Sequence, residues 1–188
     1  QEFTEYNNYD EFFRVCNVTQ NGNVVTLVYN QPEAVGLNLN FFALNPSNTY
    51  VFEFGPNAGK AKLASNLTEY SNVKVKVANR SNVYDLTLYN VSFKNASTII
   101  SSNANALNIN FYGACNISCT QAARGSDGES YGAFQIGNGG NGTNGANGVS
   151  PINATGIINI LCAGDVYIQG GSGGNGGNGG NSNSSGSS

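Results

Sequence analysis

The chain has no histidine, methionine or tryptophan, and only 10% of its 188 residues are charged, against about 25% in an average soluble domain. Without histidine, imidazole acid–base chemistry, Ser–His or Cys–His nucleophile pairs and His-ligated metals are excluded. The net charge is −3, and the charged residues form no run of like sign. We therefore expect no positively charged surface that attracts nucleic acid or anionic lipid. We therefore expect no nucleic-acid partner, no metal and no cofactor.

Long hydrophobic runs are also missing. No stretch approaches the 18 or so consecutive apolar residues of a membrane helix, so we expect no membrane span. The first residue is Gln1 rather than Met and no apolar leader follows it, which favours a mature product of export. The C-terminal residues are polar rather than a hydrophobic tail, so we expect no lipid anchor.

Asparagine is abundant, with 32 residues, and it often begins a glycosylation sequon. Chance predicts roughly five sequons at this composition. The chain has nine, at Asn17, Asn66, Asn79, Asn90, Asn95, Asn116, Asn141, Asn153 and Asn183. The excess predicts a secreted, N-glycosylated protein of the extracellular space or cell surface, although an Asn- and Ser-rich chain also produces sequons by accident. The alternation of apolar residues from Cys115 to Cys119 predicts that Asn116 faces solvent.

The four cysteines are Cys16, Cys115, Cys119 and Cys162. An even number in an exported chain predicts two disulfides, and three pairings are possible. An extended segment from Cys115 to Cys119 separates its ends by about 13 Å, too far for a bond between them. We therefore favour Cys119 with Cys162 and Cys16 with Cys115. A four-cysteine zinc site is disfavoured because only one pair is closely spaced.

The hydrophobic pattern changes from a helical to a strand period near residue 24. Aromatic residues at spacings of three and four predict a short amphipathic helix within residues 1–14 that covers a core. Period-two segments then follow one another, separated by short Asn, Gly, Ser and Pro clusters. The predicted strands lie at 24–28, 37–41, 50–54, 73–77, 86–88, 91–93, 107–111 and 158–160. The fold class is therefore all-β.

Residues 81–97 distinguish between two all-β architectures. The inward set changes at Asn90 from Leu86 and Leu88 to Val91 and Phe93, which indicates a bend there. This pattern resembles a coil of the right-handed parallel β-helices of the pectate-lyase-like superfamily and of surface adhesins with that fold. The resemblance implies a β-solenoid body with Leu86, Leu88, Val91, Phe93, Leu107, Ile109 and Phe111 inside, and an antiparallel β-sandwich is the alternative. Asn79, Asn90 and Asn95 are then either corner positions with side-chain ladders or glycan acceptors.

Two glycine tracts, residues 137–148 and 170–181, repeat every three residues. Such a composition is usually a flexible linker. A three-residue register instead matches the polyproline-II-type helix that glycine forms as polyglycine II, which is ordered only when neighbours accept its hydrogen bonds. Two such helices cannot saturate each other. We expect the tracts to mediate assembly into filaments or other multimers through Gly137, Gly139, Gly142, Gly171, Gly174, Gly177 and Gly180.

The expected organisation is an N-terminal cap (1–20), a β-solenoid body (21–169) containing the tract 137–148, and a Gly/Asn/Ser-rich tail (170–188). The one compact charged group is Arg124, Asp127 and Glu129. In β-helix polysaccharide lyases, carboxylates bind calcium and a basic residue acts as base, but this chain does not match that pattern residue by residue.

We therefore predict no enzyme. The expected function is that of a secreted, glycosylated structural or adhesive surface protein that self-associates. A β-helix protein that binds or cleaves extracellular carbohydrate is the alternative.

Overall fold

The computed structural model describes residues 2–183, and its Cα positions cluster into two compact units. Within the described residues, the first unit, here called the body, comprises residues 2–119 and 150–169. The second comprises residues 120–149 and 170–183. This division differs from the expected 1–20, 21–169 and 170–188, because the tract 137–148 groups with the tail rather than with the body. Residues 1 and 184–188 of those expected segments lie outside the described residues.

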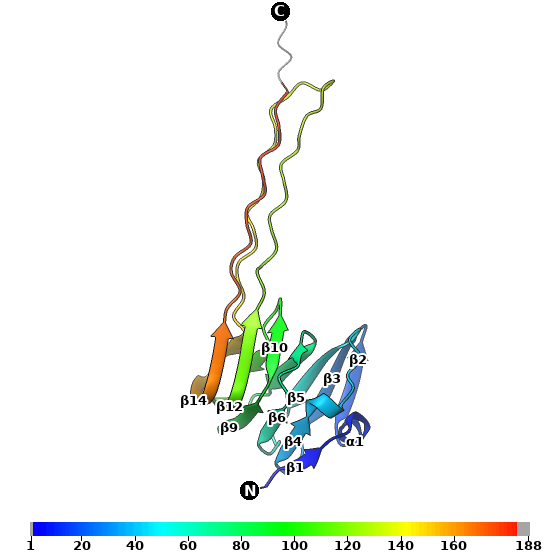
Figure 1. Ribbon diagram of the computed structural model, residues 1–188, viewed down its shortest axis with the longest axis vertical. Coiled ribbons are helices and arrows are strands. Elements are labelled where there is room, and N and C mark those ends of the chain that lie inside the picture. Colours follow the sequence, from blue (N-terminus) through cyan, green and yellow to red (C-terminus); the bar gives the residue numbers. More distant parts are fainter. Residues whose placement is uncertain (1, 184–188) are drawn as a thin grey trace, which may run out of the picture. The chain divides into compact units, whose positions relative to one another are not determined.

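The body is built almost entirely of β-strands arranged in two sheets (Figure 1). The eight-stranded sheet consists of β1 (Thr4–Tyr6), β4 (Val35–Asn38), β6 (Ala61–Ala64), β7 (Glu69–Tyr70), β9 (Tyr84–Tyr89), β10 (Ser92–Asn95), β12 (Ala106–Cys119) and β14 (Ile157–Gln169). The six-stranded sheet consists of β2 (Asn17–Asn21), β3 (Val24–Tyr29), β5 (Thr49–Phe54), β8 (Val73–Val77), β11 (Ile100–Ser102) and β13 (Ile152–Ala154). Two short helices, α1 (Tyr9–Arg14) and the 3-10 helix η1 (Leu39–Phe41), complete it. The all-β fold class is confirmed.

The strand directions correct the finer expectations. All ladders are parallel except that between β2 and β3, which Gly22 joins through a tight turn at φ +60°. The antiparallel β-sandwich is therefore wrong. The parallel β-helix solenoid is also not found, because the body combines a curled sheet of parallel strands with a mixed sheet. A local pattern of alternation and bends is compatible with several ways of pairing strands. The resemblance to β-helices that we inferred from this pattern therefore did not predict the architecture.

The core lies between the two sheets, as the period-two pattern requires. The seven residues expected inside are all fully buried, which confirms that part of the prediction: Leu86, Leu88, Val91, Phe93, Leu107, Ile109 and Phe111. Burial alternates strictly along β9 and the first half of β12. The apolar residues of each strand therefore lie beside the apolar residues of the neighbouring parallel strand.

Asn90 produces the bend that the sequence indicates. Its backbone has φ +51°, in the left-handed region that Asn tolerates better than most residues. Its Oδ1 accepts a hydrogen bond from the backbone N–H of Ala114 at 3.0 Å. A Cβ atom at Gly113 would lie 2.1 Å from that oxygen, so the glycine is required there. The bend allows β9 and β10 to pair with two successive parts of the long strand β12.

An aromatic cluster closes the N-terminal end of the body. Helix α1 starts at the N-cap Asn8, whose Oδ1 accepts a hydrogen bond from the Asp10 N–H at 2.8 Å. The helix is shorter than expected, because residues 4–6 form β1. It buries Phe12 completely against Tyr29, Phe42 and Phe52. No helix in the part of the chain that the structure describes is long and apolar enough to cross a membrane.

Replacement of Phe12 by alanine is expected to destabilise the body by about 3–5 kcal/mol, because it leaves a cavity between α1 and the sheets. The neighbouring Phe13, which is 43% exposed, provides the matched control. Phe13→Ala should cost about 1 kcal/mol or less. Urea unfolding of both variants measures the difference, and equal losses would contradict the role of Phe12 in closing the core.

Candidate functional site

The C-terminal end of the body exposes a long, unpaired strand edge. Strand β14 pairs with β12 along its entire length, from Ile157 beside Ala106 to Gln169 beside Ser118. Its other edge has no strand partner among residues 2–183. Strand β13 likewise pairs only with β11. Both sheets of the body therefore end on the same side without a cover.

The inner face of this last pair of strands is apolar and uncovered. Ile158, Ile160 and Cys162 lie beside Leu107, Ile109 and Phe111, so they continue the stripes of the core. The β12 residues are fully buried, whereas Ile160 is 47% exposed. Further along the strand, Ile168 lies beside the buried Ile117 and is 38% exposed. We call the inner face of β13 and β14 the open end; its apolar residues are Ile152, Ala154, Ile158, Ile160, Cys162, Val166 and Ile168.

The open end lacks the features that normally protect an edge strand. Natural edges are short, or carry lysine, proline or a bulge. β14 has 13 residues, none of them Lys or Pro, and Asp165 is its one charged residue. The opposite edge, β1, has three residues and carries the Glu5–Lys62 ion pair at 2.7 Å. The edge strands β14 and β1 of the eight-stranded sheet therefore differ in length, charge and cover.

The second unit contains three extended segments that lie side by side (Figure 1): the first segment (residues 120–131), the second (137–149) and the third (170–183). Their hydrogen bonds recur every three residues. N–H groups of the first segment donate to the third, for example Gly125 to Asn175 and Gly128 to Asn178, both at 2.8 Å. The second donates to the first, and the third to the second, for example Gly177 to Thr143 at 2.8 Å. The bonds thus run in a closed cycle through all three segments.

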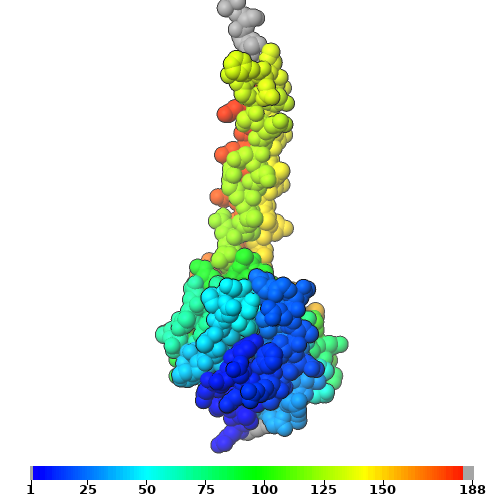
Figure 2. All heavy atoms as spheres, turned by 90° about the vertical axis from the view of Figure 1, so that its right-hand side faces the viewer, coloured from blue at the N-terminus to red at the C-terminus, as the bar shows by residue number. Residues whose placement is uncertain are grey.

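Glycine is required on the inner side of this three-segment bundle. A Cβ atom at Gly177 would lie 1.8 Å from the carbonyl oxygen of Ser126, and one at Gly142 would lie 2.3 Å from that of Gly177. A Cβ atom at the adjacent Gly176 would meet nothing closer than 3.8 Å. The atoms of the segments, green, yellow and red in Figure 2, lie directly against one another. A glycine at every third position therefore allows the backbones to approach within hydrogen-bond distance.

The residues expected to mediate assembly occupy this bundle. Gly139, Gly142, Gly174, Gly177 and Gly180 face backbone carbonyls of neighbouring segments of the same chain. Gly171 donates its N–H to Val149, and Gly137 lies against the Tyr131 ring. Their neighbours in the structure are thus intramolecular. The order of the tracts comes from a third segment, residues 120–131, that the glycine period did not reveal.

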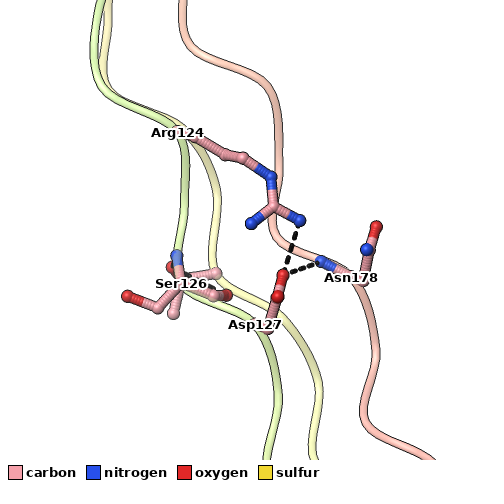
Figure 3. A network of polar contacts seen from close by, with 5 residues as sticks. Arg124, Ser126, Asp127 and Asn178 are labelled. Atoms are coloured by element: carbon pink, nitrogen blue, oxygen red, sulfur yellow. Dashed lines mark hydrogen bonds and ion pairs between the residues drawn. The ribbon is translucent and has the colours of Figure 1, made fainter.

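The charged group of the first segment ties that segment to the third (Figure 3). The Asp127 Oδ1 accepts hydrogen bonds from Arg124 Nη2 at 2.5 Å and from the Asn178 backbone N–H at 2.7 Å. These two donors hold the pKa of Asp127 below its ordinary value. Thr143 Oγ1 accepts the Ser126 N–H at 2.7 Å in the same region. The carboxylate therefore has a structural role in the bundle, and Glu129 forms no ion pair in residues 2–183.

The sequon asparagines fall into two groups by exposure. Five are exposed: Asn17, Asn66, Asn79, Asn141 and Asn153. Four are half-buried: Asn90, Asn95, Asn116 and Asn183. Among the half-buried group, the Nδ2 of Asn95 donates to Ser71 at 2.8 Å and that of Asn183 donates to Gly132 at 2.7 Å. The expectation that Asn116 faces solvent is not met, because its Oδ1 is buried and accepts no hydrogen bond from the described residues.

All four cysteines are free thiols in the structure, so neither expected disulfide is present. Cys162 lies beside Phe111 in the β12–β14 ladder, eight residues before Cys119 along β12, which corresponds to about 26 Å. Cys16 precedes β2 at one end of the six-stranded sheet, and Cys115 lies in the other sheet. A disulfide needs Cα atoms within about 7 Å. The register of the sheets, which local spacing does not reveal, separates these residues.

A cleft of about 580 Å³ lies at the N-terminal end of the body, lined among others by Tyr6, Arg14, Cys16, Tyr29 and Glu33. Burial raises the pKa of Cys16 to about 12 and, with help from nearby Glu33, that of Tyr29 to about 12. Both groups are therefore protonated at neutral pH. The cleft therefore offers hydrogen-bond donors at these two side chains, and nothing in the sequence pattern pointed to it.

Among the described residues, no group of three or more His, Cys, Asp or Glu side chains is arranged to hold a metal ion. Comparison with protein-family models, with curated proteins and with solved structures found no match. The resemblance to the pectate-lyase-like superfamily therefore has no support from these comparisons either.

Gly177→Ala is expected to open the three-segment bundle locally, because the new methyl group would overlap a backbone carbonyl. Amide exchange at Gly125, Gly174 and Gly180 should accelerate by about tenfold or more, the equivalent of roughly one hydrogen bond. Gly176→Ala is the matched control and should leave exchange unchanged, since its Cβ position is open. Hydrogen–deuterium exchange measures both. Equal behaviour of the two variants would contradict the packing.

At concentrations low enough to keep the chains apart, Cys162 is expected to react first with a thiol reagent in the folded protein, because it alone of the four cysteines is exposed in the single chain. At pH 8, a pKa of about 12 leaves roughly one Cys16 in ten thousand as thiolate. Burial also raises the pKa of Cys115 and Cys119. Colorimetric titration should give one rapid thiol natively and four after unfolding, with the rapid one absent in Cys162→Ser. Fewer than four thiols after unfolding would restore the disulfide prediction.

Proposed function

We propose that the protein is a secreted, N-glycosylated structural or adhesive surface protein and a subunit of a multimeric extracellular assembly. In this proposal the three segments of the second unit are polyglycine-II-type helices that form a stiff spacer. The body is the part that associates with other subunits.

The observation that carries the proposal is the closed hydrogen-bond cycle of the three-segment bundle. Ordering a glycine-rich chain costs on the order of 1–2 kcal/mol per residue in backbone entropy, and glycine loses more than other residues. A flexible linker has no use for such order. Each triplet in the bundle supplies one N–H to a neighbouring segment and carries glycine where the neighbouring backbone is closest. This arrangement suits a mechanical role rather than a flexible tether.

The arrangement of the polar groups supports structure or adhesion over catalysis. The Arg124–Asp127 pair is engaged within the bundle, and the cleft beside Cys16 holds its thiol protonated. A carbohydrate-cleaving enzyme needs two carboxyl groups with different pKa values on either side of a groove. The carboxylates nearest that description, Asp127 and Glu129, lie on one extended segment, and Asp127 serves a hydrogen-bonding role. No observation favours the carbohydrate-cleaving alternative.

The proposal that the protein is extracellular rests on the sequons and on the exposure of their asparagines. Five acceptor asparagines present their side chains to solvent, on the body at Asn17, Asn66, Asn79 and Asn153 and on the second segment at Asn141. An Asn side chain must be accessible to accept a glycan, so exposure on both units fits a chain that carries sugar over much of its surface.

Secretion from a host that N-glycosylates is expected to add glycan at the exposed acceptors and not at Asn95 or Asn183, whose Nδ2 atoms already donate hydrogen bonds. Peptide mapping after enzymatic glycan removal identifies the occupied sites, and at least three should be found among the five exposed ones. Native mass measurement of the same material reports the number of copies. Empty sequons throughout would contradict the glycoprotein proposal, and a monomer would contradict the assembly.

A further inference from the structure

We propose that the open end of the body binds the open end of a second copy, with β14 pairing antiparallel to β14 of that copy across a two-fold axis. This inference rests on the proposed function, because it names the partner and the contact through which subunits associate. It concerns residues of the body alone.

The first argument concerns the unpaired backbone groups at the edge of β14. β14 presents 13 residues of backbone, half of whose N–H and C=O groups point away from β12. The strand is about 43 Å long and carries none of the lysine or proline residues that keep edges apart. Its inner face extends the core with side chains that are up to about half exposed. Such an edge is a template for another strand.

The second argument is that β14 is complementary to itself. Pairing residues 157–169 antiparallel with the same residues of the second copy places Ala163 on the two-fold axis. On the inner face, Ile158 then lies opposite Ile168 and Ile160 opposite Val166. Cys162 lies opposite Gly164, which leaves room for the thiol. Every inner-face pair is therefore apolar or small, and the two exposed faces would cover each other.

The charge of the open end also suits a copy of itself. Residues 152–169 carry one charge, Asp165. In the same register Asp165 lies opposite Leu161, and the two Asp165 residues are separated by about 14 Å along the strands. That separation exceeds the Debye length of about 8 Å at physiological ionic strength, so their repulsion is weak. A strongly acidic or basic partner would find no counter-charges on this face.

The opposite end of the body makes a head-to-tail contact unfavourable. There, α1 covers the core with Phe12, and β1 offers three residues instead of 13. The ion pair of Glu5 with Lys62 also lies at that edge. A head-to-tail contact would leave most of β14 unpaired and its isoleucines exposed. Only the symmetric contact covers the full edge on both copies.

The area is consistent with a stable dimer. A strand about 43 Å long, beside sheets about 10 Å apart, gives a core cross-section on the order of 400 Å². Because β13 has only three residues and is about 10 Å long, the mean length of the two edge strands reduces that cross-section to about 250 Å². The two strands, each about 5 Å wide, bring the contact to roughly 500 Å² per copy, or about 1,000 Å² in total. That total is at the lower limit of specific protein–protein interfaces.

The test compares Ile160→Lys with Leu161→Lys in the full chain by native mass measurement at micromolar concentration. The two residues are adjacent and similarly exposed, at 47% and 51%. They lie on opposite faces of the sheet, because side chains alternate along a strand. Ile160→Lys buries an unpaired charge in the proposed contact and should weaken it at least about 100-fold, halving the number of copies. Leu161→Lys lies opposite Asp165 of the second copy and should leave the number unchanged.

Cross-linking at Cys162 gives the second readout. Diagonal neighbours in an antiparallel pair lie about 7–8 Å apart, so a short bis-maleimide that first attaches to the exposed Cys162 of a free copy should join the two Cys162 residues when the copies associate. Covalent dimers are expected from the parent chain and from Leu161→Lys, and not from Ile160→Lys or Cys162→Ser. Near-UV circular dichroism controls for folding, which should persist because Ile160 is already exposed in the single chain.

The outcomes separate this inference from the proposed function. An assembled parent whose copy number is unaffected by Ile160→Lys would overturn the open-end contact and leave the assembly proposal standing. Cross-linked dimers that persist in Cys162→Ser would place the contact elsewhere and overturn it too. A monomeric parent overturns both the contact and the assembly, while the glycan map still tests the extracellular location.

Discussion

Backbone hydrogen bonds between segments that are distant in sequence are the interaction on which both units depend. In the body, strands pair in parallel, so each partner comes from a distant part of the chain, as Leu107 pairs with Tyr84 on one side and Ile158 on the other. In the second unit, Gly125 finds its partner at Asn175. Neither unit has a long helix in residues 2–183 that could satisfy its own backbone.

The two units support these backbone hydrogen bonds with different kinds of residue. The body places β-branched and aromatic residues on alternate positions, so burial of the inner stripe adds hydrophobic free energy to the ladders. The three-segment bundle has almost no side chains to bury and instead gains close backbone approach through glycine at every third position. Its order therefore depends on hydrogen-bond geometry and on close approach at positions such as Gly177, where an added Cβ would lie 1.8 Å from a neighbouring carbonyl oxygen.

The edge strands β1 and β14 of the eight-stranded sheet differ in how they are protected from solvent. At the first edge, Phe12 of α1 fills the space above the core, and the edge strand is short and charged. At the last edge, the chain leaves β14 without returning to cover it within the described residues. Exposed isoleucines that continue a buried stripe have a free-energy cost in water, which the proposed contact with a second copy would remove.

The sequence alone determined the all-β class, the inward residues of the strands and the bend at Asn90, because alternation and backbone preference are local properties that single residues express. Only the tertiary structure decided which strands pair, and with that the separation of Cys119 from Cys162, the burial of the Asn116 oxygen and the exposure of Ile160. It also supplied the first segment, which has only Gly125 and Gly128 in the three-residue register yet completes the bundle. Register and neighbours are set by contacts across 20 to 50 residues of chain, and no local pattern encodes them.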